Sequence, residues 1–189
     1  MSHRLTLLFF DVDAGVVKAY RDILTDVREP GIRFKFLVTD VETIIRDRVL
    51  DAIVSPANSF GSMDGGIDEA YRTLFRGIEH AVKAKIRRLY PQNKGPLGNH
   101  MPVGDSLVVP THHPRCPQLI VAPTMVHPSD INDTDNIKRA MGAILTSCRQ
   151  MIKYLKRDIV VGCPGLGTGT GNMTGADSGA QILEALRSR

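Results

Sequence analysis

Cysteine is scarce in this chain, and its spacing excludes two common roles. The three cysteines, Cys116, Cys148 and Cys163, are far apart, form no C-x-x-C pair and have no histidine pair at metal-ligand spacing beside them. A disulfide framework and a zinc site are therefore not indicated, and we expect neither a metal nor another cofactor. Scattered thiols of this kind are typical of proteins in the reducing cytoplasm.

Long apolar segments are also absent near the N-terminus. The longest run there, LTLLFF, is followed directly by Asp11. It is too short for the core of a signal peptide and much too short for a membrane-spanning helix. We therefore expect a cytoplasmic protein that does not bind a membrane.

The chain has no large excess of either charge. There are 24 Lys and Arg against 20 Asp and Glu, a formal net charge of +4, and the pI is near 9.1. This balance suits anionic ligands and permits nucleic acid without requiring it. The basic run KAKIRRLY, from Lys83 to Tyr90, can be read as a nucleic-acid surface. The polar face of an amphipathic helix is the favoured interpretation, since only Tyr90 offers stacking.

The order of apolar segments predicts alternating strands and helices. Strands are expected at residues 5–13, 33–40, 50–58, 106–111, 118–125 and 158–165. Helices are expected at residues 14–26, 41–49, 67–89, 137–155 and 176–188, the last but one capped from the sequence NDTD. The strands are continuously apolar rather than alternating, so the pattern favours a mainly parallel sheet with helices on both faces. A length of 189 residues suits one domain.

Two glycine-rich segments follow strands, where parallel sheets bind their ligands. One is VVGCPGLGTGTGNM, from Val160 to Met173, and the other is SPANSFGSMDGGIDEA, from Ser55 to Ala70. Neither fits G-x-G-x-x-G, and the chain has no GK[ST], so the standard dinucleotide and P-loop motifs are excluded. Bare backbone amides could still surround phosphate oxygens. The alternative is that these loops only turn the chain.

These motifs together resemble the macro domain, a module that binds ADP-ribose. VTDV is followed by DAIVSPANS, then GGID and the later glycine-rich loop, in the family's order, so that the similarity spans Phe34 to Ile182. The resemblance implies an α/β fold, a three-layer α/β/α sandwich with a mixed, mainly parallel central sheet. Residues 1–189 would form a single such domain, with residues 1–33 as an additional N-terminal strand and helix.

The resemblance also implies roles for individual residues. Asp40 would accept a hydrogen bond from the adenine amino group, with Val41 beside it, although such an aspartate often only caps a helix. Asn58 would bind the distal ribose, and Asp68 would position a water molecule for attack on that sugar. As alternatives, Asn58 could form a strand-end turn and Asp68 could stabilise the first turn of a helix. The phosphate-facing residues would be Gly65, Gly66, Ile67, Gly165, Gly167, Thr168, Gly169, Thr170, Gly171 and Asn172.

The chain departs from the family pattern in three places. Ser55 stands where asparagine is usual, the glycine run before Asp68 is short, and the second loop has no Tyr or Phe to stack on the distal ribose. Phe60 from the first loop could supply that ring or could be a core residue. One branch of the family removes ADP-ribose from glutamate and has a catalytic lysine. That lysine has no clear counterpart in this chain.

Three functions are therefore compared. The first is binding of ADP-ribose or an ADP-ribosylated molecule, with hydrolysis at the distal ribose by Asp68 and Asn58. The second is a noncatalytic ADP-ribose reader. The third is a magnesium-dependent phosphatase that uses Asp11 and Asp13, which follow an apolar strand as in haloacid-dehalogenase-type enzymes; the short D-x-D pattern gives it little support. The oligomeric state is left open.

Overall fold

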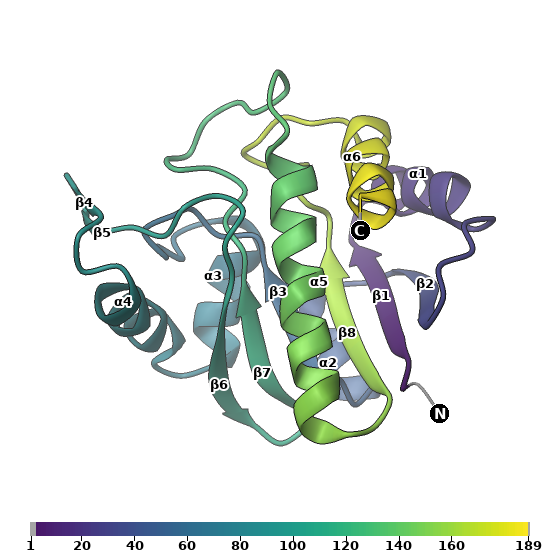
Figure 1. Cartoon of the computed structure of the whole chain (residues 1–189), viewed down its shortest axis with the longest axis horizontal. Coiled ribbons are helices and arrows are strands. Elements are labelled where there is room, and N and C mark those ends of the chain that lie inside the picture. The colour runs from purple at the N-terminus through teal and green to yellow at the C-terminus, as the bar shows by residue number, and fades with distance from the viewer. Residues whose placement is uncertain (1–2, 189) are drawn as a thin grey trace.

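The computed structural model describes residues 3–188 and places them in a three-layer α/β/α sandwich (Figure 1). The central sheet has the strand order β2-β1-β8-β3-β7-β6. Its strands are β1 (Leu5–Asp11), β2 (Ile32–Val38), β3 (Ala52–Ser55), β6 (Leu107–His113), β7 (Cys116–Val121) and β8 (Ile159–Pro164). Only the pairing of β6 with β7 is antiparallel. The prediction of a mixed, mainly parallel sheet is confirmed.

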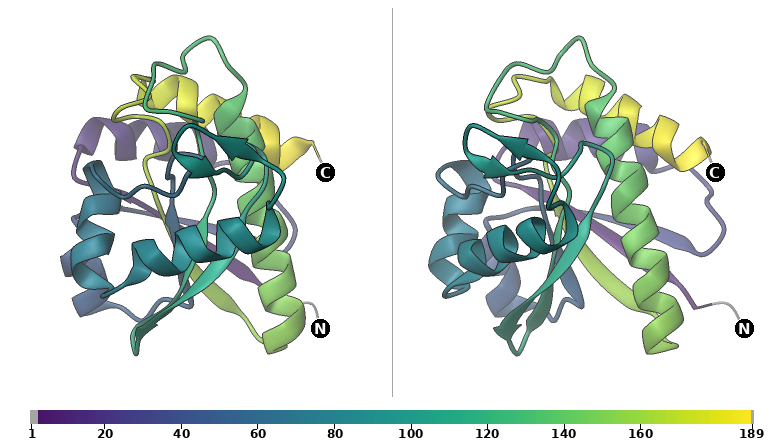
Figure 2. Two further views of the ribbon diagram at one scale, coloured as in Figure 1. Left: turned by 90° about the vertical axis from the view of Figure 1, so that its left-hand side faces the viewer. Right: turned by 60° about the vertical axis from the view of Figure 1, so that its left-hand side comes forward.

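Helices cover both faces of the sheet (Figure 2). One face carries α1 (Ala14–Leu24), α5 (Asn136–Leu155) and α6 (Gly175–Arg187), and the other carries α2 (Val41–Asp47), α3 (Gly66–Leu74) and α4 (Ile78–Leu89). Along β1, Leu7 and Phe9 belong to the first core, whereas Leu8 and Phe10 belong to the second. Burial on both faces explains why the interior strands β1, β3 and β8 are almost continuously apolar, whereas the edge strand β2 alternates.

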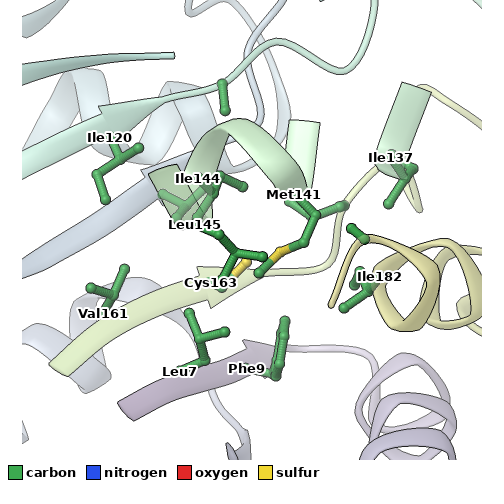
Figure 3. Close-up of a cluster of buried hydrophobic side chains, with 14 of the residues drawn as sticks. Leu7, Phe9, Ile120, Ile137, Met141, Ile144, Leu145, Val161, Cys163 and Ile182 are labelled. Carbon is green, nitrogen blue, oxygen red and sulfur yellow. The ribbon is translucent and has the colours of Figure 1, made fainter. Parts of the chain in front are cut away.

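Figure 3 shows the core on the α5 side of the sheet. Met141 and Ile144 of α5 lie over Leu7 of β1 and Val161 of β8, and Ile182 of α6 lies beside them, all without solvent exposure. Truncating a fully buried aliphatic side chain destabilises a protein by about 2–5 kcal/mol. This packing fixes β1 and β8 next to each other, and with them the loops that follow these strands.

The N-terminal element predicted at residues 1–33 contributes β1 to the interior of the sheet. β1 pairs with β2 on one side, from Leu5 with Ile32 to Asp11 with Val38. On its other side it pairs with β8, from Leu5 with Ile159 to Phe10 with Pro164. The first strand of the domain is therefore held on both edges.

The prediction of one helix over residues 67–89 is wrong. The segment forms α3 and α4, separated at Phe75 to Gly77, and Gly77 has a left-handed φ of 79° that a helix cannot contain. The periodicity continues through the break because Tyr71, Ile78 and Val82 all face the same core.

One further difference concerns a loop. The segment after α4, predicted to lack regular structure, contains a short hairpin of β4 (Lys94–Gly95) and β5 (Gly98–Asn99). The predicted cap of α5 from the sequence NDTD is confirmed: Asp135 is the N-cap, and Thr134 Oγ1 accepts a hydrogen bond from Asn136 N at 3.3 Å. Within residues 3–188, no helix is long and apolar enough to cross a membrane.

Candidate functional site

A cavity of about 490 Å³ lies where the parallel strands β1, β2, β3 and β8 end. Four segments that follow these strands line it: residues 10–13 with Val16, residues 39–41, Pro56 with residues 65–68 and Ala70, and residues 164–170 except Leu166. The carboxyl edge of a parallel sheet is the usual ligand site of such folds. Both glycine-rich loops predicted from the sequence meet here.

The backbone of the loop after β8 is fixed by hydrogen bonds to side chains of other elements. Leu166 N donates to the Tyr20 hydroxyl at 2.9 Å, and the Ser178 hydroxyl donates to Leu166 O at 2.7 Å. Gly165 N donates to Asp11 Oδ2 at 3.3 Å. These bonds tie the loop to α1, α6 and β1, and they leave Gly167, Thr168, Gly169 and Thr170 lining the cavity.

The opposite wall is the N-terminus of α3. Its N-cap, Gly65, provides no side-chain cap, so the first amides of the helix keep their hydrogen-bonding capacity. Gly66 has a φ of 58°, and a Cβ added at Gly65 or Gly66 would meet no atom within 4 Å. Unblocked amides at a helix N-terminus favour an anionic ligand.

Asp68, in the first turn of α3, also lines the cavity although it is only 8% exposed. Burial raises the pKa of its carboxyl to about 7, and a hydrogen bond from Ser55 opposes part of that rise. The Ser55 hydroxyl donates to Asp68 Oδ1 at 2.5 Å. Ser55, the departure from the family sequence, is therefore the direct partner of this carboxyl. Near neutral pH the group can both release and accept a proton.

Asp40 caps a helix, one of the two roles considered from the sequence, and it also lies at the cavity. It is the N-cap of α2, and its carboxylate accepts from Thr43 N at 2.7 Å and from Thr43 Oγ1 at 3.0 Å. The bond from the Thr43 amide is the main reason why the pKa of Asp40 is lowered. Asp40 is exposed and lines the cavity together with Val41. The cap thus fixes an ionised carboxylate at one end of the cavity.

Three predicted site residues are not among those that line the cavity. Asn58 Oδ1 accepts from Phe60 N at 3.0 Å and from Ser62 N at 3.2 Å, so its amide braces its own loop. Gly171 O accepts from Ile131 N at 3.0 Å, and Asn172 Nδ2 donates to Asp130 Oδ2 at 2.8 Å. Gly171 and Asn172 therefore anchor the end of the glycine-rich loop.

Phe60 does not line the cavity either. It is 4% exposed, and its ring lies 5.4 Å from that of His100 and 5.0 Å from that of His127, measured between centroids. The ring is enclosed by these neighbours, in agreement with the core interpretation of Phe60.

The N-terminal segment supplies lining residues that the family motifs do not include. Asp11, Val12 and Asp13 lie at the end of β1, and Val12 is 72% exposed. Asp11 Oδ1 accepts from Asp13 N at 2.9 Å, and Asp13 caps α1 through Gly15 N at 2.7 Å. The signal in the sequence was the pair Asp11 and Asp13 at the end of an apolar strand, the pair on which the phosphatase hypothesis rests.

The two aspartates have no further metal-ligating neighbours in the described chain. Within residues 3–188, no group of three or more His, Cys, Asp or Glu is arranged to hold a metal ion. The hydrogen bonds made by Asp11 and Asp13 instead form the turn between β1 and α1. The magnesium-dependent phosphatase hypothesis gains no support from this arrangement.

The fold and the cavity define a class: an α/β domain with a cavity between two glycine-rich loops at the carboxyl edge of the parallel strands. The sequence model of the macro domain matches residues 54–182, more than half of the chain. The chain therefore belongs to the macro domain family. A protein of unassigned function from Aquifex aeolicus is 28% identical over 138 residues, which cover 72% of this chain and 73% of that protein.

Solved structures agree on the fold. The macrodomain of Mycobacterium tuberculosis DarG has a TM-score of 0.55 and 21% identity, with 75% of this chain and 84% of that chain covered. An Oceanobacillus iheyensis macrodomain with ADP has a TM-score of 0.55 and 17% identity, covering 75% and 70%. A variant of that macrodomain with ADPR has a TM-score of 0.56 and 17% identity, covering 77% and 75%.

Proposed function

We propose that this protein binds ADP-ribose, free or attached to another molecule, in the cavity between the two glycine-rich loops. The observation that carries the proposal is that both loops line one cavity, one of them at the uncapped N-terminus of α3. Membership of the macro domain family and the ADP and ADPR complexes of the Oceanobacillus iheyensis macrodomain support it.

The diphosphate would lie between the loops. Residues 65–67 and 167–170 line this part of the cavity, and their backbone amides would donate to the phosphate oxygens. The dipole of α3 favours negative charge there. The adenine would lie toward Asp40 and Val41. The Asp40 carboxylate would accept from the adenine amino group while it also caps α2.

The proposal also includes a reaction, hydrolysis at the distal ribose of the bound molecule. Water would add to the anomeric carbon as the bond from that carbon to the leaving oxygen breaks. Asp68 would accept a proton from the water and return it to the leaving oxygen, which a pKa of about 7 for its carboxyl allows. Because the Asn58 amide is bonded to backbone, we assign Asn58 to holding the first loop in place.

Calorimetric titration with ADP-ribose, ADP and AMP tests the binding proposal. We expect micromolar binding of ADP-ribose and ADP and much weaker binding of AMP, because AMP cannot span the two loops. Gly165→Ala should weaken binding of ADP at least tenfold. Its added Cβ would lie under 3.0 Å from Asp11 Oδ2 and Thr168 Oγ1 and would displace the loop.

Two further variants complete this test. Gly142→Ala, on α5 and outside the cavity, has no atom within 4 Å of the added Cβ and should bind as the natural protein does. Asp40→Ser keeps a residue that caps helices well but removes the carboxylate, so it should weaken binding of ADP-ribose while α2 stays folded. No binding by the folded natural protein would contradict the proposal.

Turnover distinguishes an enzyme from a reader. Asp68→Asn should bind ADP-ribose within about threefold of the natural protein and lose release of ADP-ribose from an ADP-ribosylated protein or of phosphate from ADP-ribose 1''-phosphate. If the natural protein binds ADP-ribose but cleaves neither substrate, the reader function is correct.

We also propose a cytoplasmic location, since Cys116, Cys148 and Cys163 are buried thiols.

A further inference from the structure

A second hollow, of about 740 Å³, lies along β2 and the end of α1, on residues separate from those that line the ligand cavity. Its lining includes four cationic side chains, Arg21, Arg28, Arg33 and Lys35, against one carboxylate, Glu29. All four cations are exposed. Within residues 3–188, none of the four forms a salt bridge.

The two edges of the sheet differ in how they are covered. β6, at one edge, packs against α4, and Lys85 Nζ donates to the Val108 carbonyl of β6 at 2.5 Å. β2, at the other edge, pairs with β1 and packs against α1 (Figure 1). In the described part of the chain, no backbone hydrogen bond beyond the β1 pairing reaches residues 33–38. An edge strand of this kind can accept a further strand.

Basic and aromatic side chains alternate along β2 from Arg33 to Phe36. Phe34 and Phe36 are half-buried, and their rings stack on Phe9 with centroids 6.4 Å and 6.0 Å away. Arg33 and Lys35 are exposed, and alternation along a strand places them on the opposite face. A strand laid beside β2 would therefore meet Phe34 and Phe36 on one face and Arg33 and Lys35 on the other.

The end of α1 closes the hollow on the aromatic side. Arg21 from the last turn of α1 and Arg28 from the following loop both line it, and Arg28 Nη1 donates to Thr25 O at 3.2 Å. A groove between an edge strand and a helix is the arrangement in which domains bind extended peptides, with backbone pairing for affinity and alternate side chains for specificity.

We propose that the edge of β2 binds an extended acidic peptide segment of a partner protein, which adds a strand to the sheet. Its apolar side chains would cover Phe34 and Phe36, and its carboxylates would meet Arg33 and Lys35. A second copy of the chain is disfavoured, because β2 paired with β2 would bring the same cations together. A nucleic acid would satisfy the charges but could not pair with the strand backbone. This proposal does not depend on ADP-ribose binding.

The probe is a synthetic peptide as long as β2 in which glutamate and valine alternate, with a matched peptide in which lysine replaces glutamate. Fluorescence anisotropy without ADP-ribose measures binding, and amide hydrogen exchange locates it. We expect the glutamate peptide to bind and to slow exchange in residues 32–38, while the lysine peptide does neither. No binding at about 1 mM peptide would overturn the proposal.

Charge reversal sharpens the test. Arg33→Glu with Lys35→Glu should weaken the glutamate peptide at least tenfold and allow the lysine peptide to bind. Arg87→Glu with Arg88→Glu, on the exposed side of α4, changes the net charge equally and should leave both peptides unaffected. Equal effects of the two pairs would contradict a site on β2.

Two other results would also overturn the proposal. Sedimentation that shows a dimer, dissolved by Arg33→Glu with Lys35→Glu, would mean that a second copy covers β2. A single-stranded oligonucleotide that protects residues 32–38 more strongly than the glutamate peptide would mean that the partner is a nucleic acid.

Discussion

At the scale of single residues, Asp68 has an environment unlike that of the other carboxylates of the site. Asp40 is exposed and bonded to an amide, which lowers its pKa, whereas Asp68 is buried, which raises its pKa to about 7. The surroundings of these two aspartates therefore favour opposite forms, the charged form of Asp40 and the protonated form of Asp68.

The raised pKa of Asp68 predicts a dependence of stability on pH. The folded protein keeps this proton up to about pH 7, whereas the unfolded chain releases it near the ordinary value of 3.8. The contribution of Asp68 to the free energy of unfolding therefore falls as pH rises through this interval. Asp68→Asn, which does not titrate, should gain roughly 2–3 kcal/mol relative to the natural protein between about pH 5 and about pH 8.

Urea unfolding of both proteins at the two pH values measures this difference, in which the other titrating groups cancel. Ser55→Ala gives a second reading. It removes the hydrogen bond that opposes the rise in pKa, so the pKa of Asp68 should increase further. An unchanged difference between pH 5 and pH 8 would show that Asp68 titrates as an exposed carboxyl.

The site could be predicted from the sequence where it depends on local motifs. Asp40 and Gly165 line the cavity because each follows a strand that ends there, and Gly65 and Gly66 line it at the N-terminus of α3. Asn58 also follows a strand, but its amide is satisfied by Phe60 and Ser62 within its own loop, which no spacing rule reveals. From the sequence, Asp11 was placed in a phosphatase motif and not in this cavity. Its position beside Gly165 depends on the pairing of β1 with β8, which the sequence does not show.

At the scale of helices and strands, the break between α3 and α4 depends on the backbone conformation of Gly77. Its φ of 79° is strained for any residue with a Cβ. The sequence could not reveal the break, since Tyr71 before it and Ile78 after it are buried in the same core and keep the helical period intact. The spacing of apolar residues shows which side of a helix faces the core. It does not show where the helix axis changes direction.

Gly77→Ala should therefore lower the free energy of unfolding by about 1–2 kcal/mol, although the added Cβ would have no atom within 4 Å. Gly142→Ala, in the middle of α5 and equally uncrowded, should raise it by up to about 1 kcal/mol, because alanine favours the helix. Urea unfolding compares the two. Shifts of the same sign would mean that backbone conformation at Gly77 does not control the break.

At the scale of the whole molecule, the N-terminal segment places β1 between two other strands of the sheet. The family match begins at residue 54, after β1 and β2. Yet β1 joins β2 to β8, and Phe9 carries the stacking of Phe34 and Phe36. The layered architecture was predictable from alternating segments, but the order of the strands was not, because it is set by contacts between distant parts of the chain.

We predict that a chain starting at Ile32, without β1 and α1, will not fold. It would expose the edge of β8 and remove Asp11 and Tyr20 from the glycine-rich loop. Circular dichroism and amide NMR during urea titration should show no cooperative transition. A dispersed spectrum with a sharp transition would mean that residues 32–189 are sufficient for the fold.

The pairing of β1 with β8 also bears on how the protein is made. Asp11 and Gly165 are 154 positions apart. During synthesis, β1 leaves the ribosome long before its partner strand exists, so one edge of a largely apolar strand stays open while most of the domain is translated. Contacts of such long sequence separation form slowly, and open strand edges invite aggregation. Nascent chains halted before β8 should therefore engage chaperones, and release past α6 should end that engagement.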